Sequence, residues 1–593
     1  MPPPELPAGT KRRRLAASPD AEEFQIFQVP PATAEECQGS PENGAAVPFG
    51  EDPDNSPDAD KPWGTGSCLP PPPPESPFQE PMPSPASPPP TPASEQFLIR
   101  EGSHRDAFLK FFKSGETFAS TYSVGRKIGE GGFGKVFMAR HRVLGLARAV
   151  KRLNKSVGRK ESRKNELDAL MALDHPHIVR LVEYYDEEVY LYLVFELCEG
   201  PDLFDRIVKA PSGRLEEYDA SCALRHMLKA LQCCHAQYRG HFDIKPENFM
   251  YSDMSYANLK MIDLGMSSGF DLHRRRHKIK GTAAYMAPEF WRGIYGPEGD
   301  VWSCGVVLFV MLTGEPLLPN LSPATMKCEA KVRSLLRRRL TYAATTFNLS
   351  PLAQDLLEAM LQYDRHGRVT IREALNHSFN SRAYDIERQN QDRTGDTSKG
   401  EAVRILERLP AALREVAREP MLKRVARLAM AHVGEVPALE SLAFRMLDWY
   451  GYGEISLSVL EKDFQSRRQE VPEDLDQVFE AIDINRDGYV SYLTFLSATL
   501  PPAMRKCESL CKVVFGIFDR NKDGAVDADD LTGVFGEEDR GRRPAGGGAG
   551  PTTASSTPSS VGPQCAGGWV IISSTPRERC EGGVPAHRLG GVV

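Results

Sequence analysis

The sequence predicts an α+β protein whose folded part lies between two disordered ends. Strand-like apolar segments come first, on either side of the glycine-rich stretch IGEGGFGKVF at 128–137. Helical patterns follow in NELDALMALDHPHIV and in the apolar stretch DVWSCGVVLFVMLTG. Two aspartate-rich loops then recur 36 residues apart, which indicates a repeated unit after the main domain.

Both ends have the composition of disordered segments. Residues 1–97 are rich in proline and poor in aromatic residues, so they cannot bury enough apolar surface to offset chain entropy. Residues 536–593 are rich in glycine, serine and proline and are expected to form a flexible tail. The folded part lies between them, with 98–121 as a lead-in segment.

Composition excludes several classes of protein. A net charge of -7 and a pI near 6.1 give no nucleic-acid footprint, and the twelve cysteines, scattered without metal-ligand spacing, fit reduced thiols. The first residues lack a signal-peptide core, the longest apolar run is too short to cross a bilayer, and Pro2 excludes N-myristoylation. We expect a cytoplasmic monomer without a transmembrane segment.

Two features of the N-terminal extension suggest partners. KRRR, from Lys11 to Arg14, is either a solvated charge run or a nuclear-import signal. The stretch PPPPPESP could bind partners with SH3- or WW-like aromatic grooves.

The first chemical signal is a glycine pattern formed by Gly129, Gly131 and Gly134. Alone it is weak, because glycines also mark ordinary hairpin turns. Its weight comes from Lys151 at the end of a strand-like run and Glu166 on the helix that follows. A backbone without side chains can close over a triphosphate, a lysine can hold its oxygens, and a carboxylate can hold that lysine in place.

The second signal is HFDIKPEN at 241–248. Asp243 can accept the proton of an attacking hydroxyl, and Lys245 can neutralise charge on a moving phosphoryl group. Asn248 can ligate a magnesium ion, and Asp263 in KMIDLG supplies a second metal ligand. The segment therefore predicts phosphoryl transfer.

Two further elements follow in order, Glu289 in MAPE and its expected buried partner Arg368. With them the chain resembles the eukaryotic protein kinases over residues 122–379. The resemblance implies a two-lobed protein kinase fold, with a small antiparallel sheet and one helix, then a mainly helical lobe, and ATP between them. It also implies a gatekeeper at Phe195. The ATP-binding residues that it implies are Gly129, Gly131, Gly134, Val136, Lys151, Glu166, Glu196 and Cys198.

Two acidic positions bear on the substrate. Asp202 and Glu247 match positions that contact basic residues upstream of the phosphorylated serine or threonine in that family. The resemblance thus implies a serine/threonine kinase whose protein substrates carry basic residues near the acceptor. In the alternative interpretation, Asp202 only holds the ribose of ATP.

Phe242 departs from the family pattern. In kinases switched by phosphorylation, an arginine before the catalytic aspartate pairs with a phosphate on the activation loop. Phe242 cannot form that pair, and the loop carries Ser267 and Ser268 near its start with basic residues at 274–276. We expect active chemistry without the usual phosphorylation switch.

Two segments match the calcium-binding EF-hand loop. The first, at 483–494, offers Asp483, Asn485, Asp487, Tyr489 through its carbonyl, and Ser491. The second, at 519–530, offers Asp519, Asn521, Asp523, Ala525 through its carbonyl, Asp527 and Asp530. An upstream copy at 448–459 keeps Asp448 and Gly453 but has Tyr450, Tyr452 and Val459 at ligand positions.

The last ligand position departs from the pattern in both good loops. A bidentate glutamate is usual there, but the first loop has Thr494 and the second has the shorter Asp530. We expect Thr494 to weaken calcium binding severely, and Asp530 to weaken it or to favour magnesium. The alternative is a retained EF-hand fold that docks without sensing calcium. No fourth loop precedes the tail, and we hypothesise that the tail is an alternative or misassembled end.

A basic amphipathic stretch, EPMLKRVARLAMAHVGE, lies between the kinase-like segment and the loops. Such helices insert into calcium-sensor grooves, and an ordinary packing helix is the alternative. The whole order resembles the calcium-dependent protein kinases, which implies a junction segment at 380–435 and an EF-hand module at 436–535. In that family, calcium loading pulls the junction away from the substrate cleft.

The leading hypothesis is a serine/threonine kinase that uses ATP and Mg²⁺ and is regulated by Ca²⁺ at its own EF-hands. A calcium-insensitive kinase is the nearest alternative, supported by Phe242 and Thr494. A catalytically inactive scaffold that recruits partners through its proline-rich arm is the third.

Overall fold

The computed structural model describes residues 117–526, with gaps at 132–133, 157–159, 265–267, 270–280, 320–321, 382–397, 468, 484–486 and 520. The two segments predicted to be disordered, 1–97 and 536–593, lie outside the described residues. No helix in the described part of the chain is long and apolar enough to cross a membrane.

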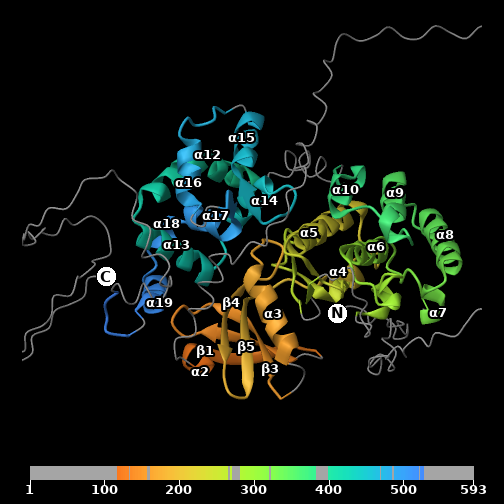
Figure 1. Cartoon of the computed structure of the whole chain (residues 1–593), viewed down its shortest axis with the longest axis horizontal. Helices are drawn as coiled ribbons and strands as arrows, with labels where there is room; N and C mark the ends of the chain where they lie inside the picture. The colour runs from red at the N-terminus through yellow and green to blue at the C-terminus, as the bar shows by residue number, and fades with distance from the viewer. Residues whose placement is uncertain are drawn as a thin grey trace, which may run out of the picture. The chain divides into compact units, whose positions relative to one another are not determined.

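The first part of the fold is a five-stranded antiparallel sheet with strand order β1-β2-β3-β5-β4 and one long helix, α3, beside it (Figure 1). The strands are β1 (Tyr122–Gly131), β2 (Gly134–His141), β3 (Ala147–Asn154), β4 (Leu181–Asp186) and β5 (Tyr190–Glu196). A short helix, α2 (Phe118–Thr121), leads into the sheet, and α3 spans Lys160–Ala172. The predicted glycine-rich hairpin is therefore β1–β2.

The helix α3 ends earlier than the pattern NELDALMALDHPHIV suggested. It stops at Ala172, and Ile178 forms a bridge to Met261 instead. Pro176 provides the physical reason, because the residue before a proline is pushed out of the helical region. The chain can therefore turn at 173–177 and enter β4.

The second part is mainly helical. Its helices are α4 (Leu203–Lys209), α5 (Glu217–Ala236), α6 (Pro297–Thr313), α7 (Pro323–Met326), α8 (Glu329–Thr346), α9 (Pro351–Met360) and α10 (Ile371–Asn376). Short strands pair as β6 (Arg239–Gly240) with β9 (Ser268–Gly269) and β7 (Phe249–Tyr251) with β8 (Leu259–Met261). The short 3-10 turns are η2 (Pro246–Asn248), η3 (Ala283–Tyr285), η4 (Phe290–Arg292) and η5 (Arg365–Gly367).

The helix α6 forms the centre of this helical part. Pro297 occupies its first turn, where a missing N–H costs nothing, and Gly314 ends it in the left-handed region. Trp302 and Phe309 are almost completely buried, as are most other side chains of α6. Figure 1 shows α5, α9 and α10 around it. The apolar helix predicted at 300–314 is therefore a core helix.

The third part is an all-helical module with its own apolar core. It comprises α12 (Ser398–Arg418), α13 (Met421–Val433), α14 (Ala438–Leu447), α15 (Leu457–Ser466), α16 (Leu475–Ile482), α17 (Tyr492–Thr499), α18 (Pro502–Arg505) and α19 (Glu508–Phe518). Strands β10 (Glu454–Ser456) and β11 (Tyr489–Ser491) pair antiparallel, with Ile455 opposite Val490. The degenerate loop at 448–459 thus pairs with the loop at 483–494.

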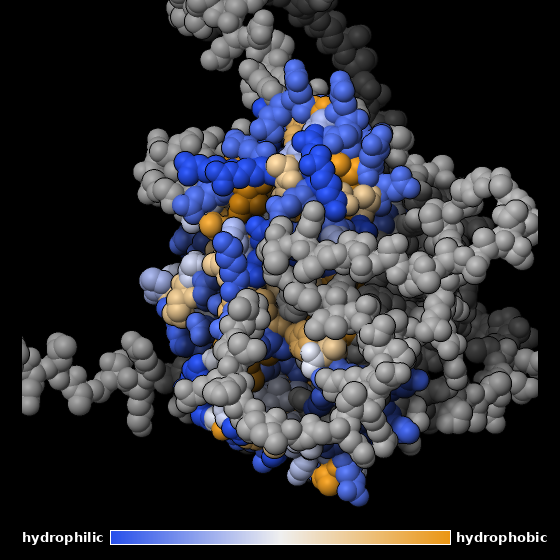
Figure 2. Space-filling view, turned by 90° about the vertical axis from the view of Figure 1, so that its left-hand side faces the viewer, coloured by the Kyte–Doolittle hydropathy of each residue, from blue (hydrophilic) through white to orange (hydrophobic). Residues whose placement is uncertain are grey.

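The amphipathic stretch predicted between the domains is α13. Val425, Leu428, Ala429 and Val433 are buried in the core of the helical module. The apolar stripe therefore packs against the chain's own EF-hand helices, which both sequence interpretations allow. On the face drawn in Figure 2 the described residues are mainly hydrophilic, with separate apolar spots, as is normal for a protein surface.

Candidate active site and calcium loops

Lys151 lies between two carboxylates from different elements. Its Nζ donates to Glu166 Oε1 of α3 at 2.6 Å and to Asp263 Oδ1, just after β8, at 3.1 Å. Burial alone would lower the pKa of Lys151, but Asp263 and Glu166 raise it well above its usual value. The lysine is therefore held charged and in one position, as phosphate binding requires.

The glycine hairpin needs its third glycine. Gly134 has φ +155°, and a Cβ there would lie 2.5 Å from the carbonyl oxygen of Arg152 on β3. Gly131 pairs directly with Gly134, and Gly129 pairs with Val136. Gly134 thus lets β2 lie close to β3, the neighbouring strand that carries Lys151.

Both carboxylate oxygens of Asp243 are contacted by other residues of the protein. Its Oδ1 accepts hydrogen bonds from the Thr282 backbone N at 2.8 Å and from Thr282 Oγ1 at 2.7 Å. Lys245 Nζ lies 3.4 Å from Asp243 Oδ2 and donates to Thr282 Oγ1. Asn248 Nδ2 donates to the Asp243 backbone oxygen at 2.7 Å. These contacts gather the predicted catalytic residues around one carboxylate.

Sequence reasoning missed Thr282 and Asp300. Thr282 lies in GTAAY before η3, and Asp300 is a fully buried residue in the first turn of α6. The Asp300 carboxylate accepts from the backbone N of His241 and Phe242, and lies 2.9 Å from His235 Nε2. It therefore fixes the backbone just before Asp243. The signals available in the sequence were that Thr282 shortly precedes MAPE and that Asp300 is the first residue of DVWS.

Phe242 occupies a left-handed backbone conformation, with φ +64°. Its buried ring lies edge-on to Phe290, at 5.7 Å between centroids, and to Tyr295, at 5.3 Å. Phe290 and Tyr295 stack on each other at 4.4 Å. An aromatic cluster of these three residues thus occupies the position where an arginine could pair with a phosphate.

Gly281 allows the following segment to reach the catalytic loop. It has φ +113°, and a Cβ there would lie 2.7 Å from the Phe242 backbone oxygen. Further along, Glu289 forms a bidentate pair with Arg368, at 2.6 and 3.2 Å, as the sequence suggested. The segment from Gly281 to Glu289 is therefore anchored at both ends.

The expected hinge follows the buried Phe195 at the end of β5. Glu196 Oε1 accepts from Lys260 Nζ at 2.6 Å and from the Arg180 backbone N at 2.8 Å. Burial raises the pKa of Glu196, but Lys260 and Arg180 outweigh it and hold the pKa below its usual value. Burial raises the pKa of the Cys198 thiol to about 12, so the thiol is neutral.

The two acidic residues expected to meet substrate lie close together. Asp202 begins α4 as its N-cap and accepts from the Asp205 backbone N at 2.7 Å, and Glu247 lies in η2. Burial is the main cause that raises the pKa of Glu247, and the negative charges of Asp202 and Asp243 add to it. This concentration of negative charge suits a basic peptide.

The loop at 483–494 is arranged around Asp483. Its carboxylate accepts from the backbone N of Asp487 and Gly488, and Asp487 Oδ1 accepts from Tyr489 N at 2.9 Å. Thr494 Oγ1 lies 3.0 Å from Ser491 Oγ, so the last ligand position is engaged at the start of α17. Asn485 lies outside the described residues.

The loop at 519–530 has the same internal bonds over the part that the structure describes. Asp519 accepts from the backbone N of Asp523 and Gly524, and Asp523 Oδ1 accepts from Ala525 N at 2.8 Å. Asn521 Oδ1 accepts from Asp523 N. Asp527 and Asp530 lie outside the described residues, so this ligand set stays a prediction.

The donor chemistry differs among the three loops. Carboxylate, amide and carbonyl oxygens at 483–494 and 519–530 are ligands that calcium prefers. Within the described residues, no group of three or more His, Cys, Asp or Glu side chains is arranged to hold a metal ion. The residues at 448–459 do not fit calcium, because Tyr450, Tyr452 and Val459 replace oxygen ligands.

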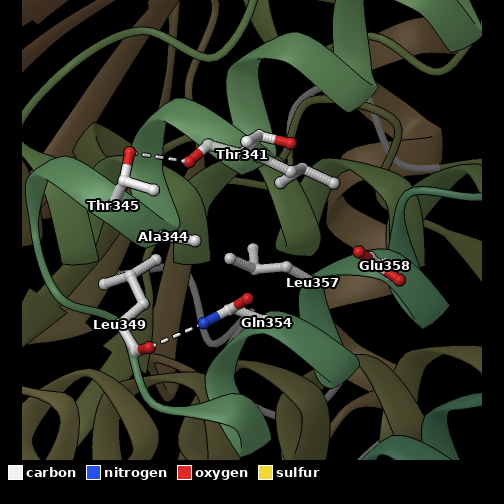
Figure 3. A pocket seen from close by; sticks show the side chains of 8 residues that line it. Thr341, Ala344, Thr345, Leu349, Gln354, Leu357 and Glu358 are labelled. Atoms are coloured by element: carbon white, nitrogen blue, oxygen red, sulfur yellow. Dashed lines mark hydrogen bonds between the residues drawn. The ribbon is translucent and has the colours of Figure 1, made fainter.

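A cavity of about 250 Å³ lies between α8 and α9 (Figure 3). It is lined by none of the candidate site residues. Thr345 Oγ1 donates to the Thr341 backbone oxygen and Gln354 Nε2 to that of Leu349, so these two polar side chains of its wall are already bonded. We assign no role to it.

Comparison with known proteins supports both parts of the site. Residues 122–380 match the protein kinase domain, and 475–493 and 512–535 match an EF hand. The chain is 30% identical to calcium-dependent protein kinase 32 of Arabidopsis thaliana over 436 residues, which are 72% of this chain and 77% of that protein. It is also 30% identical to calcium-dependent protein kinase 14 of the same plant, over 76% of this chain and 82% of that one.

Proposed function

The chain belongs to the calcium-dependent protein kinases, and on this premise we propose how its residues act. It is a calcium-regulated serine/threonine protein kinase. Its reaction transfers the ATP γ-phosphate to a serine or threonine hydroxyl of a protein. The observation that carries the proposal is the convergence of Lys151, Glu166 and Asp263 with the Asp243–Thr282 contact.

ATP supplies the phosphoryl group, and magnesium ions supply positive charge at its phosphates. Lys151 would bind the phosphates, with the β1–β2 hairpin above them. Asn248 and Asp263 would ligate magnesium, and the hinge from Glu196 to Cys198 would bind the purine.

Asp243 would accept the proton of the substrate hydroxyl, since its Oδ1 is fixed by Thr282 at 2.7 Å. Lys245 would stabilise the transferred charge. Asp202 and Glu247 would bind basic residues before the acceptor. The proximity of these two carboxylates favours that role over a ribose contact by Asp202 alone.

Calcium would bind at 483–494 and 519–530, and the first of these loops would bind it weakly. Thr494 supports this, because it lacks the carboxylate that usually completes the loop. We further propose a monomer in the cytoplasm, and a recruiting role for the proline-rich arm.

The test is phosphorylation of an arginine-containing serine peptide by the full chain, with magnesium and ATP constant. We expect activity to rise with calcium over chelator, to fall when the arginines are replaced by glutamine, and to vanish in Asp243→Asn. Equal activity in calcium and chelator would support structural EF-hands. No activity in either condition would favour the scaffold.

A further inference from the structure

In the degenerate hand at 448–459, the carboxylate at the first ligand position, Asp448, is fully hydrogen-bonded within the protein. Asp448 Oδ1 accepts from the backbone N of Gly451 at 2.9 Å and of Tyr452 at 3.0 Å. Its Oδ2 accepts from Gly453 N at 2.9 Å. The carboxylate is buried, so the loop holds its shape without a metal ion.

A lysine of the kinase domain donates a hydrogen bond to the backbone of Asp448. Lys229 of α5 is buried, and its Nζ donates to the Asp448 backbone oxygen at 2.6 Å. His175 Nε2 lies 3.6 Å from Asp448 Oδ2, and both side chains are buried. Losing this acceptor while the interface stays closed would leave a buried ammonium ion without a partner, so the contact makes a mismatched interface costly.

Two glycines let the loop come this close. A Cβ on Gly451, where φ is +75°, would lie 2.6 Å from Lys229 Cα. A Cβ on Gly453, where φ is +78°, would lie 2.6 Å from the Asp174 backbone oxygen. Gly488, at the equivalent position of the next hand, has φ +81° and nothing within 4 Å of its Cβ. Of these two equivalent glycines, only Gly453 packs against the kinase domain.

Neighbouring contacts extend the same interface. Asp174 Oδ2 accepts from the Leu493 backbone N at 2.7 Å, which attaches the second hand of the pair. Arg225 of α5 lies over the Trp449 ring, at 5.0 Å. None of these contacts involves a calcium ligand of the two good loops.

Two arginines of the kinase domain bind the C-terminal end of α13. Arg148 donates to the Val433 backbone oxygen, and Arg180 donates to those of Ala431, at 2.6 Å, and Gly434, at 3.1 Å. Positive charge at a helix C-terminus is favourable, and both guanidinium groups are buried.

We propose that the first hand is a calcium-independent docking element that fixes the paired hands to α5 of the kinase domain, with Lys229 as the cation that faces Asp448. Calcium then acts at 483–494 and 519–530 while this contact persists. The inference concerns docking, and it stands or falls separately from catalysis.

The experiment is hydrogen–deuterium exchange of the full chain, in calcium and in chelator, read at peptides covering 225–232 and 448–456. We expect the same protection in both conditions. Calcium-dependent change at 448–456 as large as that at 483–494 would overturn the proposal.

Two variants measured in chelator test the contact itself. Gly453→Ala and Gly488→Ala share the backbone strain of a left-handed residue, but only the first clashes with the kinase domain. We expect Gly453→Ala to speed exchange at 225–232 roughly 10- to 100-fold, as the loss of a charged hydrogen bond would, and Gly488→Ala to leave it unchanged.

Lys229→Met changes only the kinase side of the contact, so an effect on 448–456 cannot come from a folding defect of the loop's own sequence. It should speed exchange at 448–456 by a similar factor. Equal exchange in Gly453→Ala and Gly488→Ala, or no effect of Lys229→Met, would refute the docking role.

Discussion

Replacing Phe242 by alanine should destabilise the kinase domain measurably. The ring is 2% exposed and lies edge-on to Phe290 and Tyr295. Removing a fully buried phenylalanine side chain costs about 3–5 kcal/mol of unfolding free energy. At about 2–4 °C per kcal/mol for a domain of this size, the melting temperature should fall by about 6–20 °C.

The kinetic effect separates a positioning role from simple packing. Phe242 directly precedes Asp243, and its backbone oxygen lies against Gly281, next to Thr282. Loss of the ring should therefore lower kcat for a peptide substrate, even well below the melting temperature.

Phe309→Ala provides the matched control, since Phe309 is fully buried on α6 beside Arg339. It should lose similar stability and keep its kcat at low temperature. The assay is thermal unfolding together with peptide kinetics at about 15 °C below both transitions. Equal kcat losses in the two variants would refute a positioning role for Phe242.

Three other perturbations have clear expected results. Thr282→Val should lower kcat roughly 10- to 100-fold by removing the hydroxyl bond to Asp243, and Thr282→Ser should restore it; equal rates in both variants would contradict this. Thr494→Glu should tighten calcium binding at least about tenfold in calorimetry, because it supplies the missing carboxylate; unchanged affinity would exclude that explanation. Burial lowers the pKa of His177 and of His226 well below 6.5, so the unfolded state takes up protons first as the pH falls. The stability that each neutral ring provides is complete above pH 6.5. Below pH 6.5 the free energy of unfolding should fall by up to about 1.4 kcal/mol per pH unit for each histidine. Equal urea midpoints at pH values of about 7.5 and 5.5 would disprove this expectation.

Motifs that are local in the sequence were predictable. Asp243, Lys245 and Asn248 lie within one loop, so their residue types, their spacing and the resemblance to protein kinases were enough to predict that they act together. The contact between Asp243 and Thr282 spans 39 residues, and no periodicity links them. The sequence could indicate that a threonine was present, but only the fold brings its hydroxyl to the carboxylate.

The docking of the first hand on the kinase domain could not be predicted from the sequence. Lys229 appears in the sequence as one residue of an amphipathic helix, and Asp448 as the remnant of a metal site. Their contact joins residues 219 apart. A buried lysine and a glycine in an unusual backbone conformation become informative only once their neighbours are known.

At two sites of this chain, a contact within the protein stands where a phosphate or a metal ion would otherwise be bound. At Phe242 an aromatic cluster takes the place of an arginine–phosphate pair, and at Asp448 a lysine from the kinase domain faces a loop that does not fit calcium. Neither contact includes a phosphate or a metal ion, so we expect both to persist whatever the phosphorylation state or the calcium concentration. Calcium control must then act through the loops that retain oxygen ligands, and Thr494 weakens one of these. We therefore expect the loop beginning at Asp519 to carry most of the calcium response of this kinase, so that changes there alter activation more than changes at 483–494.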